Sequence, residues 1–308
     1  MNAPADFSPA PNSSATPVPS RDNAALAALL PWPDARANKY TRGKLSLVAG
    51  AAAYPGAACL AGTAAERAGA GYTEVFCAGK SLLAVRAFRP SLVARDWREW
   101  HPARQETPRA GHPAACVIGC GFDGSAPQRE LVAETVRAAA GPVLVDGGGL
   151  GLIADETGQR LARERAERGT GALVLTPHGG EAARLARGAG LEGVPEGPEL
   201  ACALAQAYCA LVVLKGPATY IADAEGAVEV MDRGTAALAK AGTGDVLAGI
   251  VGALLAQGLA PRDAAALGCA LHAEAGRAAA EKITEICVAA EDVIAYLPQA
   301  IRAIANAR

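Results

Sequence analysis

Gly242-Thr243-Gly244-Asp245 is the stretch of this sequence whose residue types and spacing most directly predict chemistry. Apolar residues at helical spacing follow it, from Val246 to Leu255, so these four residues should begin a helix that buries an apolar stripe. The first N–H groups of a helix are unpaired and attract phosphate. Beside them, the carboxylate of Asp245 could act as a base for a hydroxyl group that attacks phosphorus. Alternatively, Asp245 merely caps the helix, where acidic residues are favoured.

A second candidate site is the segment Thr176-Pro177-His178-Gly179-Gly180-Glu181, which follows a short apolar strand. Thr176 as cap, Pro177 at the first helical position and Glu181 in the first turn predict the start of a helix. Capping explains these three residues but leaves His178 without a structural role.

A third candidate is the loop formed by Lys215, Gly216, Pro217, Ala218 and Thr219, between a strand over Leu211–Leu214 and a hairpin over 220–230. Lys-Gly after a strand is a weak signal when it stands alone.

Glycine-containing turns follow three further strands that the apolar runs predict. Gly56 and Ala57 follow a strand over 45–49, Gly121 follows a strand over 115–119, and Asp146 ends a strand over 142–146. Small residues at such turns also permit close packing of a helix on a sheet, and Asp146 could simply cap its strand.

The elements that would position these residues alternate between strand and helix across residues 45–305. This order predicts an α/β fold with a mainly parallel central sheet and helices on both faces. In such sheets ligands bind at the carboxyl ends of the strands, which is where every candidate segment falls. Residues 1–30 are rich in Ala, Pro and Ser and predict a disordered or weakly ordered tail, and residues 31–308 predict one domain.

Composition narrows the classes of partner. The 308 residues are 51% hydrophobic with a net charge of −2, which gives no reason to expect nucleic acid or a membrane surface as partner. Eight scattered cysteines without metal-ligand spacing indicate reduced thiols in a cytoplasmic protein and no structural zinc. Within residues 78–113, Trp97 and Trp100 alternate with arginines, and we expect them to form a solvated face.

Taken together, several of these motifs occur in an order that resembles the ADP-dependent NAD(P)H-hydrate dehydratases, a branch of the ribokinase-like superfamily. The resemblance covers roughly residues 31–305 and rests on the segments 39–71, 176–181, 215–219 and 234–249. It implies a ribokinase-like fold. It also implies site residues: Asp245 as the catalytic base; Gly56, Ala57, Gly121, His178 and Asp245 at the hydrated nicotinamide substrate; Lys215, Gly216, Pro217, Ala218, Thr219, Gly242, Thr243 and Gly244 at the nucleotide; and Glu181 near Mg²⁺.

Two segments depart from the pattern of the family. Cys120 and Asp123 flank Gly121 where relatives usually show Gly-Pro-Gly-Leu-Gly. Gly148 stands where relatives often carry a second aspartate after Asp146.

The resemblance implies an enzyme that repairs hydrated NADH and NADPH, with ADP consumed to AMP and phosphate and with Mg²⁺ as cofactor. It also implies a homo-oligomer, often a tetramer in this family, and no fused epimerase domain is expected in a chain of this length. Two alternatives remain open. One is a vitamin-precursor kinase of the same fold, although such relatives commonly carry Cys in place of Asp245. The other is a non-catalytic nucleotide-binding module.

Overall fold

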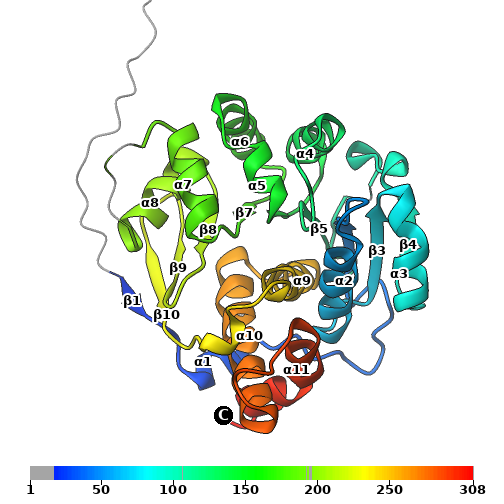
Figure 1. The fold of residues 1–308 in the computed structure, drawn as a ribbon, viewed down its shortest axis with the longest axis vertical. Helices are drawn as coiled ribbons and strands as arrows, with labels where there is room; N and C mark the ends of the chain where they lie inside the picture. The colour runs from blue at the N-terminus through cyan, green and yellow to red at the C-terminus, as the bar shows by residue number, and fades with distance from the viewer. Residues whose placement is uncertain (1–16, 106, 192, 194–195, 308) are drawn as a thin grey trace, which may run out of the picture.

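The computed structural model describes residues 17–105, 107–191, 193 and 196–307, and within them the chain folds around one ten-stranded sheet (Figure 1). The strands are β1 (Val18–Pro19), β2 (Lys44–Val48), β3 (Tyr72–Cys77), β4 (Val93–Asp96), β5 (Ala114–Ile118), β6 (Val143–Val145), β7 (Leu173–Leu175), β8 (Leu211–Leu214), β9 (Thr219–Ala222) and β10 (Val228–Met231). The α-helices are α1 (Asn23–Ala28), α2 (Pro55–Arg67), α3 (Leu82–Phe88), α4 (Ala126–Ala138), α5 (Gly148–Leu152), α6 (Glu156–Arg168), α7 (Gly179–Gly188), α8 (Pro198–Ala207), α9 (Thr243–Ala256), α10 (Pro261–Ile283) and α11 (Ala290–Ala305).

The sheet is mainly parallel, as its short apolar strands predict. The strand order is β1-β10-β9-β8-β7-β6-β5-β2-β3-β4, and β9 runs antiparallel to both of its neighbours. β3 pairs with β2, and β4 pairs with β3. The next strand, β5, pairs with the opposite edge of β2. The strand order therefore reverses between β2 and β5, which is where such sheets place their ligands.

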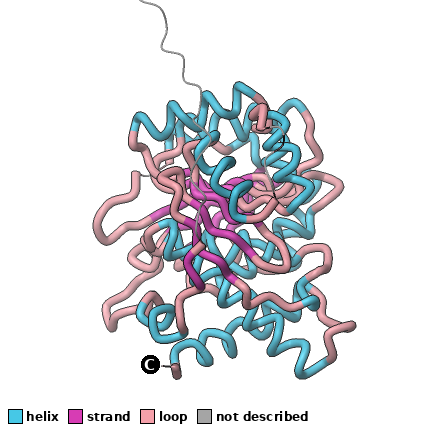
Figure 2. Tube along the Cα trace, turned by 90° about the vertical axis from the view of Figure 1, so that its left-hand side faces the viewer, coloured by secondary structure: helices cyan, strands magenta, loops and turns pink. Residues whose placement is uncertain are grey.

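Helices cover both faces of the sheet, and the strands lie between them (Figure 2). The buried residues form two hydrophobic clusters. In one, the sheet packs against α1, α2, α9, α10 and α11, and in the other it packs against α4 to α8. The mainly parallel sheet with helices on both faces confirms the fold class that the sequence predicts.

Helix α9 is more deeply buried than its sequence pattern indicates. We expected one apolar stripe, but every residue from Val246 to Ala256 is buried. The helix contacts β5, α2, α10 and α11, so its small residues face neighbours on all sides. A helix that is apolar all round is typical of this position. The site at its N-terminus thus stands on a rigid support.

Part of the predicted N-terminal tail lies against the domain. Val18–Pro19 pairs with β10, and Leu26 in α1 is fully buried. Arg21 forms ion pairs with Glu229 and with Asp263 of α10. Asp263 lies in the first turn of α10, which begins at Pro261. Residues 1–16 of the predicted tail lie outside the described residues.

The predicted solvated face within residues 78–113 is wrong for its tryptophans. Trp100 is 2% exposed, and its indole N–H donates to Thr135 Oγ1 at 2.8 Å. Its ring lies 4.9 Å from that of Phe76, and Trp97 meets Phe122 edge to face. Trp100 belongs to the core and Trp97 packs against it half-buried, because aromatic burial outweighs the polar neighbours in the sequence.

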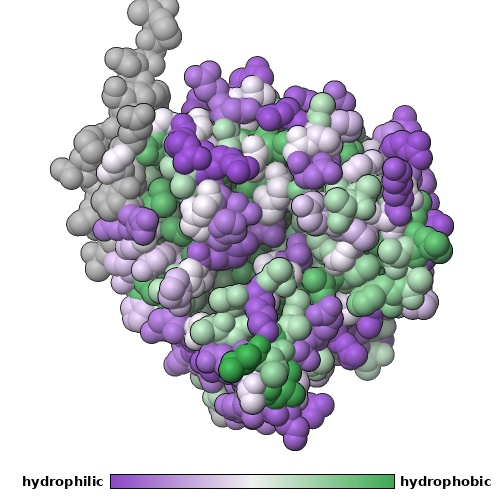
Figure 3. Space-filling model, in the orientation of Figure 1, coloured by the Kyte–Doolittle hydropathy of each residue, from purple (hydrophilic) through white to green (hydrophobic). Residues whose placement is uncertain are grey.

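The surface carries both hydrophilic and hydrophobic residues on the face shown in Figure 3. In the part of the chain that the structure describes, we find no helix that is long and apolar enough to cross a membrane. All eight cysteines are free, and Cys287 is exposed.

Candidate active site

The loops that follow β2 and β5 meet at the point where the strand order reverses. Gly50 N donates to the Cys120 carbonyl at 2.9 Å, and Ala51 N donates to the Gly121 carbonyl at 3.0 Å. Gly121 has a φ of +66°, and a Cβ there would lie 2.6 Å from the Cβ of Ala57. Only glycine combines this backbone conformation with so close an approach. The structure therefore brings Ala57 and Gly121 together, while Gly56 beside them is exposed.

The N-terminus of α9 is held by its own turn. Gly242 is the cap residue in the left-handed region, with a φ of +91°. The Thr243 hydroxyl lies 2.7 Å from the Leu238 carbonyl and 2.8 Å from that of Lys240, to which it donates. The Thr243 hydroxyl is thus used inside the turn. Asp245 is the third helical residue rather than the cap, so capping does not explain its position.

Three polar side chains follow three adjacent strands and meet in a cluster. Asp146 follows β6, Thr176 follows β7, and Lys215 follows β8. Lys215 Nζ lies 2.8 Å from Asp146 Oδ1, and the Thr176 hydroxyl donates to the same oxygen at 2.5 Å. Asp146 is 3% exposed, so its charge is balanced by these two partners rather than by water.

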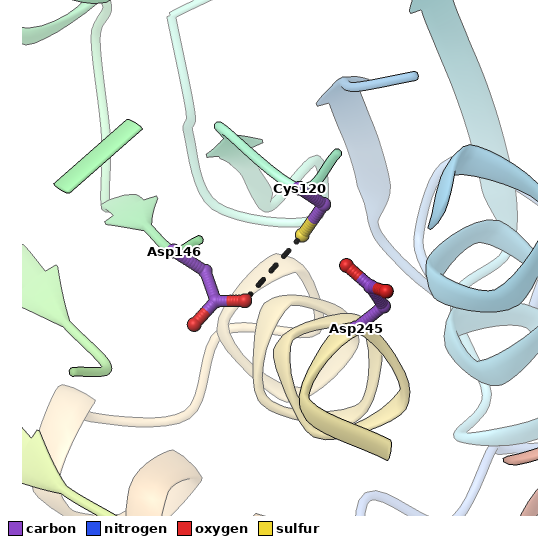
Figure 4. Close-up of side chains that lie close together, drawn as sticks. All are labelled: Cys120, Asp146 and Asp245. Carbon is purple, nitrogen blue, oxygen red and sulfur yellow. Dashed lines mark hydrogen bonds between the residues drawn. The ribbon is translucent and has the colours of Figure 1, made fainter. Parts of the chain in front are cut away.

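Asp245 and Cys120 complete this cluster (Figure 4). The Cys120 sulfur and one carboxylate oxygen each of Asp146 and Asp245 all lie within 4.8 Å of one another. The thiol donates to Asp146 Oδ2 at 3.8 Å. Burial, with the negative charges of Asp146 and Asp245, raises the pKa of the Cys120 thiol well above its usual value. Cys120 is therefore a protonated donor and not a nucleophile.

Asp245 has the electrostatic environment of a general base. Burial, reinforced by the charge of Asp146, raises the pKa of Asp245 to about 6. Glu181 also raises it, whereas the Lys215 ammonium and a hydrogen bond from Cys120 lower it. A carboxylate with a pKa near neutrality is a better proton acceptor than an ordinary one and is still ionised at pH 7.

Lys215 is charged despite its burial. Burial lowers the pKa of its ammonium, but Asp146 and Glu181 outweigh this effect and raise it above its usual value. Its backbone N–H donates to the Pro177 carbonyl at 2.8 Å, which joins the Lys215 loop to the start of α7. The predicted His178 and Lys215 segments are thus neighbours, although 37 positions separate these two residues in the sequence.

The start of α7 differs from the predicted one. His178 is the cap residue, and its Nδ1 accepts from Gly180 N at 3.0 Å. Glu181 Oε2 accepts from His178 N at 2.9 Å, so the two residues form a reciprocal capping box. The predictions of Thr176 as cap and of Pro177 as the first helical residue are wrong, because α7 begins at Gly179 and the Thr176 hydroxyl donates to Asp146. His178 therefore has the structural role that the predicted cap did not give it. His178 has a side chain that is 62% exposed, so it caps the helix and still faces outward.

Glu181 is the predicted residue near Mg²⁺. Burial raises the pKa of its carboxyl, although Lys215 and the His178 N–H oppose the rise. Its carboxylate also lies 3.6 Å from His178 Nε2. A role near a metal ion stays a prediction for this residue.

The two departures from the family pattern occur together in space. A Cβ at Gly148 would lie 2.2 Å from the carbonyl oxygen of Phe122, so a larger residue at position 148 would collide with the Cys120–Asp123 turn. A side chain at position 148 would therefore require the Cys120–Asp123 turn to move. Sequence reasoning saw both departures but could not see their contact.

The remaining predicted nucleotide residues lie at the edge of the cluster. Gly216 and Pro217 are exposed, and Ala218 is half-buried. Thr219 begins β9 and pairs with Met231. The loop therefore turns Lys215 inward while its next residues face outward.

The side chains of the cluster do not suit a Mg²⁺ ion bound directly between them. Mg²⁺ requires octahedral oxygen ligands and keeps several of its waters. One of the three candidate groups here is the Cys120 thiol, and Asp146 is already paired with Lys215 and Thr176. Any Mg²⁺ would need ligands from outside this group.

The fold is ribokinase-like. A ribokinase-like superfamily protein from Enterococcus faecalis shares the fold with a TM-score of 0.74 and 21% identity, over 93% of this chain and 96% of that one. A family model for NAD(P)H-hydrate dehydratase matches residues 45–299. The chain belongs to the NAD(P)H-hydrate dehydratase family.

Individual relatives agree with this assignment. The chain is 32% identical to the ADP-dependent (S)-NAD(P)H-hydrate dehydratase of Xanthomonas campestris, over 87% of this chain and 91% of that protein. It is 33% identical to the bifunctional NAD(P)H-hydrate repair enzyme of Moorella thermoacetica, and spans about half of that protein (52%). The structure of the ADP/ATP-dependent dehydratase of Bacillus subtilis, co-crystallised with ATP/Mg²⁺, has a TM-score of 0.76 and 26% identity, over 93% and 99% of the two chains.

Proposed function

We propose that this protein converts hydrated NADH and NADPH back to NADH and NADPH, with ADP consumed to AMP and phosphate. The observation that carries the proposal is the place of Asp245, at the N-terminus of α9 and beside the loops where the strand order reverses. Its raised pKa, about 6, suits it to accept a proton. Membership of the dehydratase family supports the substrate.

The chemistry begins at the hydroxyl group on C6 of the hydrated nicotinamide ring. Asp245 accepts its proton while the oxygen bonds to the β-phosphorus of ADP and the bond to AMP breaks. The ring nitrogen's electrons then expel the phosphate from C6, and loss of a proton from C5 restores the reduced ring. The predicted N–H groups of Gly242, Thr243 and Gly244 would stabilise charge on the transferred phosphoryl group.

The other predicted residues would bind and orient. Ala57 and Gly121, which contact each other at the reversal of strand order, with Gly56 and His178, would hold the hydrated dinucleotide. The Lys215–Thr219 loop would hold the nucleotide. We propose that Mg²⁺ accompanies the nucleotide phosphates. The predicted homo-oligomer and cytoplasmic location also stay predictions.

The test is incubation of the protein with hydrated NADH, ADP and Mg²⁺, following the near-ultraviolet absorbance of NADH and the release of AMP. We expect the absorbance of NADH and the amount of AMP to rise together. A parallel run with ATP compares ADP and ATP as phosphoryl donors. A stable phosphorylated alcohol would instead identify a kinase. Nucleotide binding with no turnover would identify a binding module, and either result would overturn the proposal.

A further inference from the structure

The ammonium of Lys215 is paired with a buried carboxylate of the site, that of Asp146. Its Nζ is 2.8 Å from Asp146 Oδ1. The charge of Glu181 also acts on the Lys215 ammonium, and the charges of Asp146 and Asp245 act on each other. The Lys215 side chain is 18% exposed and that of Asp146 is 4% exposed. A lysine side chain that is mostly removed from water usually has an acidic partner. The pairing is therefore a built feature and not a surface contact.

The same ammonium lies against the first turn of α9. A Cβ added to Gly244 would lie 3.5 Å from Lys215 Nζ. A helix N-terminus carries partial positive charge and disfavours a cation. Lys215 is held there only because the carboxylates outweigh that cost, and they raise the pKa of the ammonium.

We propose that Lys215 is the resident cation of these carboxylates, and that the nucleotide-free protein therefore takes up no divalent cation at Asp146, Cys120 and Asp245. A divalent ion there would have to displace the ammonium from Asp146 and bind beside it. The thiol of Cys120 adds no ligand that Mg²⁺ accepts. The Lys215 ammonium thus provides the positive charge that such an acidic cluster would otherwise obtain by binding a cation from solution.

This inference also deepens the proposed function, on which its second part rests. The divalent cation would arrive on the nucleotide phosphates. On their arrival Lys215, already fixed at the mouth of α9, would face both Asp146 and a phosphate group. The first part concerns the protein without nucleotide, so its test does not depend on whether the proposed reaction occurs.

The experiment is a titration of the nucleotide-free, full-length protein with Mn²⁺, a paramagnetic substitute for Mg²⁺, read by the electron paramagnetic resonance signal of free Mn²⁺. We expect the wild-type protein to leave the signal of free Mn²⁺ unchanged up to millimolar concentrations. Lys215→Met should gain one Mn²⁺ site, seen as a loss of the free Mn²⁺ signal within this concentration range. Adding Asp146→Asn to Lys215→Met should remove that gain.

A matched control is Lys240→Met. Lys240 also precedes α9, but it is exposed and its Nζ is bonded to the Ile286 carbonyl, so this variant should behave as the wild type. Lys215→Gln is a second variant that removes the charge with a smaller change in polarity. If neither lysine variant folds, the wild-type titration decides. Nucleotide-independent Mn²⁺ binding that Asp146→Asn abolishes would overturn the inference, and so would folded lysine variants without the new site.

Discussion

The hydroxyl of Thr176 lies 2.5 Å from Asp146 Oδ1, although 30 positions separate the two residues in the sequence. Each residue directly follows its strand, and β6 and β7 are neighbours. Adjacent parallel strands bring their carboxyl ends together, so the turn after one strand can orient the side chain after the other. Thr176 and Lys215 therefore contact the same carboxylate oxygen of Asp146.

Replacing Thr176 by Val should therefore destabilise the fold. The substitution removes a hydrogen bond to a buried charged group, which costs about 1.5–3 kcal/mol. Thr176→Ser keeps the hydroxyl and should lose less stability than Thr176→Val. Urea denaturation at pH 7 measures the free energy of unfolding of each. A Val variant as stable as the wild type would show that the hydrogen bond is not formed.

Asp245→Asn should abolish turnover while nucleotide binding persists. Loss of a general base typically lowers the rate by about 10²–10⁴, and the amide retains the shape of the side chain. Initial rates with hydrated NADH and calorimetry with ADP separate the two effects. Asp232→Asn, at an exposed aspartate, serves as the control and should keep its rate. An active Asp245→Asn protein would remove Asp245 from the mechanism.

The rate should fall as the pH drops through about 6, where the Asp245 carboxylate takes up a proton. Four groups face this carboxylate: Asp146 and Glu181 raise its pKa, and Lys215 and Cys120 lower it. Asp146→Asn removes a negative charge and frees the Lys215 charge, and both changes lower the pKa of Asp245. The acidic limb of the kcat/KM profile should then move to lower pH. A limb that stays in place would mean that another group titrates there.

The same burial should make Asp245 costly for stability. In the unfolded chain its carboxyl loses its proton near pH 3.8, but in the folded protein only near 6, so stability falls as the pH rises through this interval. Above it, Asp245→Asn should be more stable than the wild type. Because the side chain is partly exposed, we expect about 1–2 kcal/mol, less than the full shift implies.

Thermal unfolding at pH 4 and at pH 7.5 tests this effect. The advantage of the Asn variant over the wild type should be present at pH 7.5 and nearly absent at pH 4. An Asn variant that is less stable at both values would contradict the expected cost of the buried charge.

Gly121→Ala should disturb the substrate loops, and Gly124→Ala is its matched control. Both glycines have positive φ, so both substitutions add backbone strain. Only the Cβ at Gly121 meets other atoms, at 2.6 Å from Ala57 and 2.9 Å from Tyr54 O, whereas that at Gly124 meets none within 4 Å. We expect a higher KM for hydrated NADH and a larger loss of Tm for Gly121→Ala. Equal effects of the two variants would assign the whole change to backbone strain.

Much of the fold could be predicted because short apolar runs and helical periodicities are local. The strands around Leu45, Val117 and Leu211 lie within a residue or so of their predicted places. The errors occurred where burial depends on distant partners. Trp100 was assigned to a solvated face, yet Phe76 and Thr135 enclose it, and neither contact leaves a signal near Trp100 in the sequence.

The sequence by itself determined the order of strands and helices and the residues that follow each strand. Hydrophobic periodicity and turn-forming residues are local features of the sequence, so they can be recognised without the tertiary structure. It therefore determined that Asp245, His178 and Lys215 would stand at one edge of a parallel sheet. Only the tertiary structure decided which strand ends are neighbours, and with that the Lys215–Asp146 pair across 69 positions. It also decided the pKa of Asp245, because desolvation and charge act through space and not along the chain.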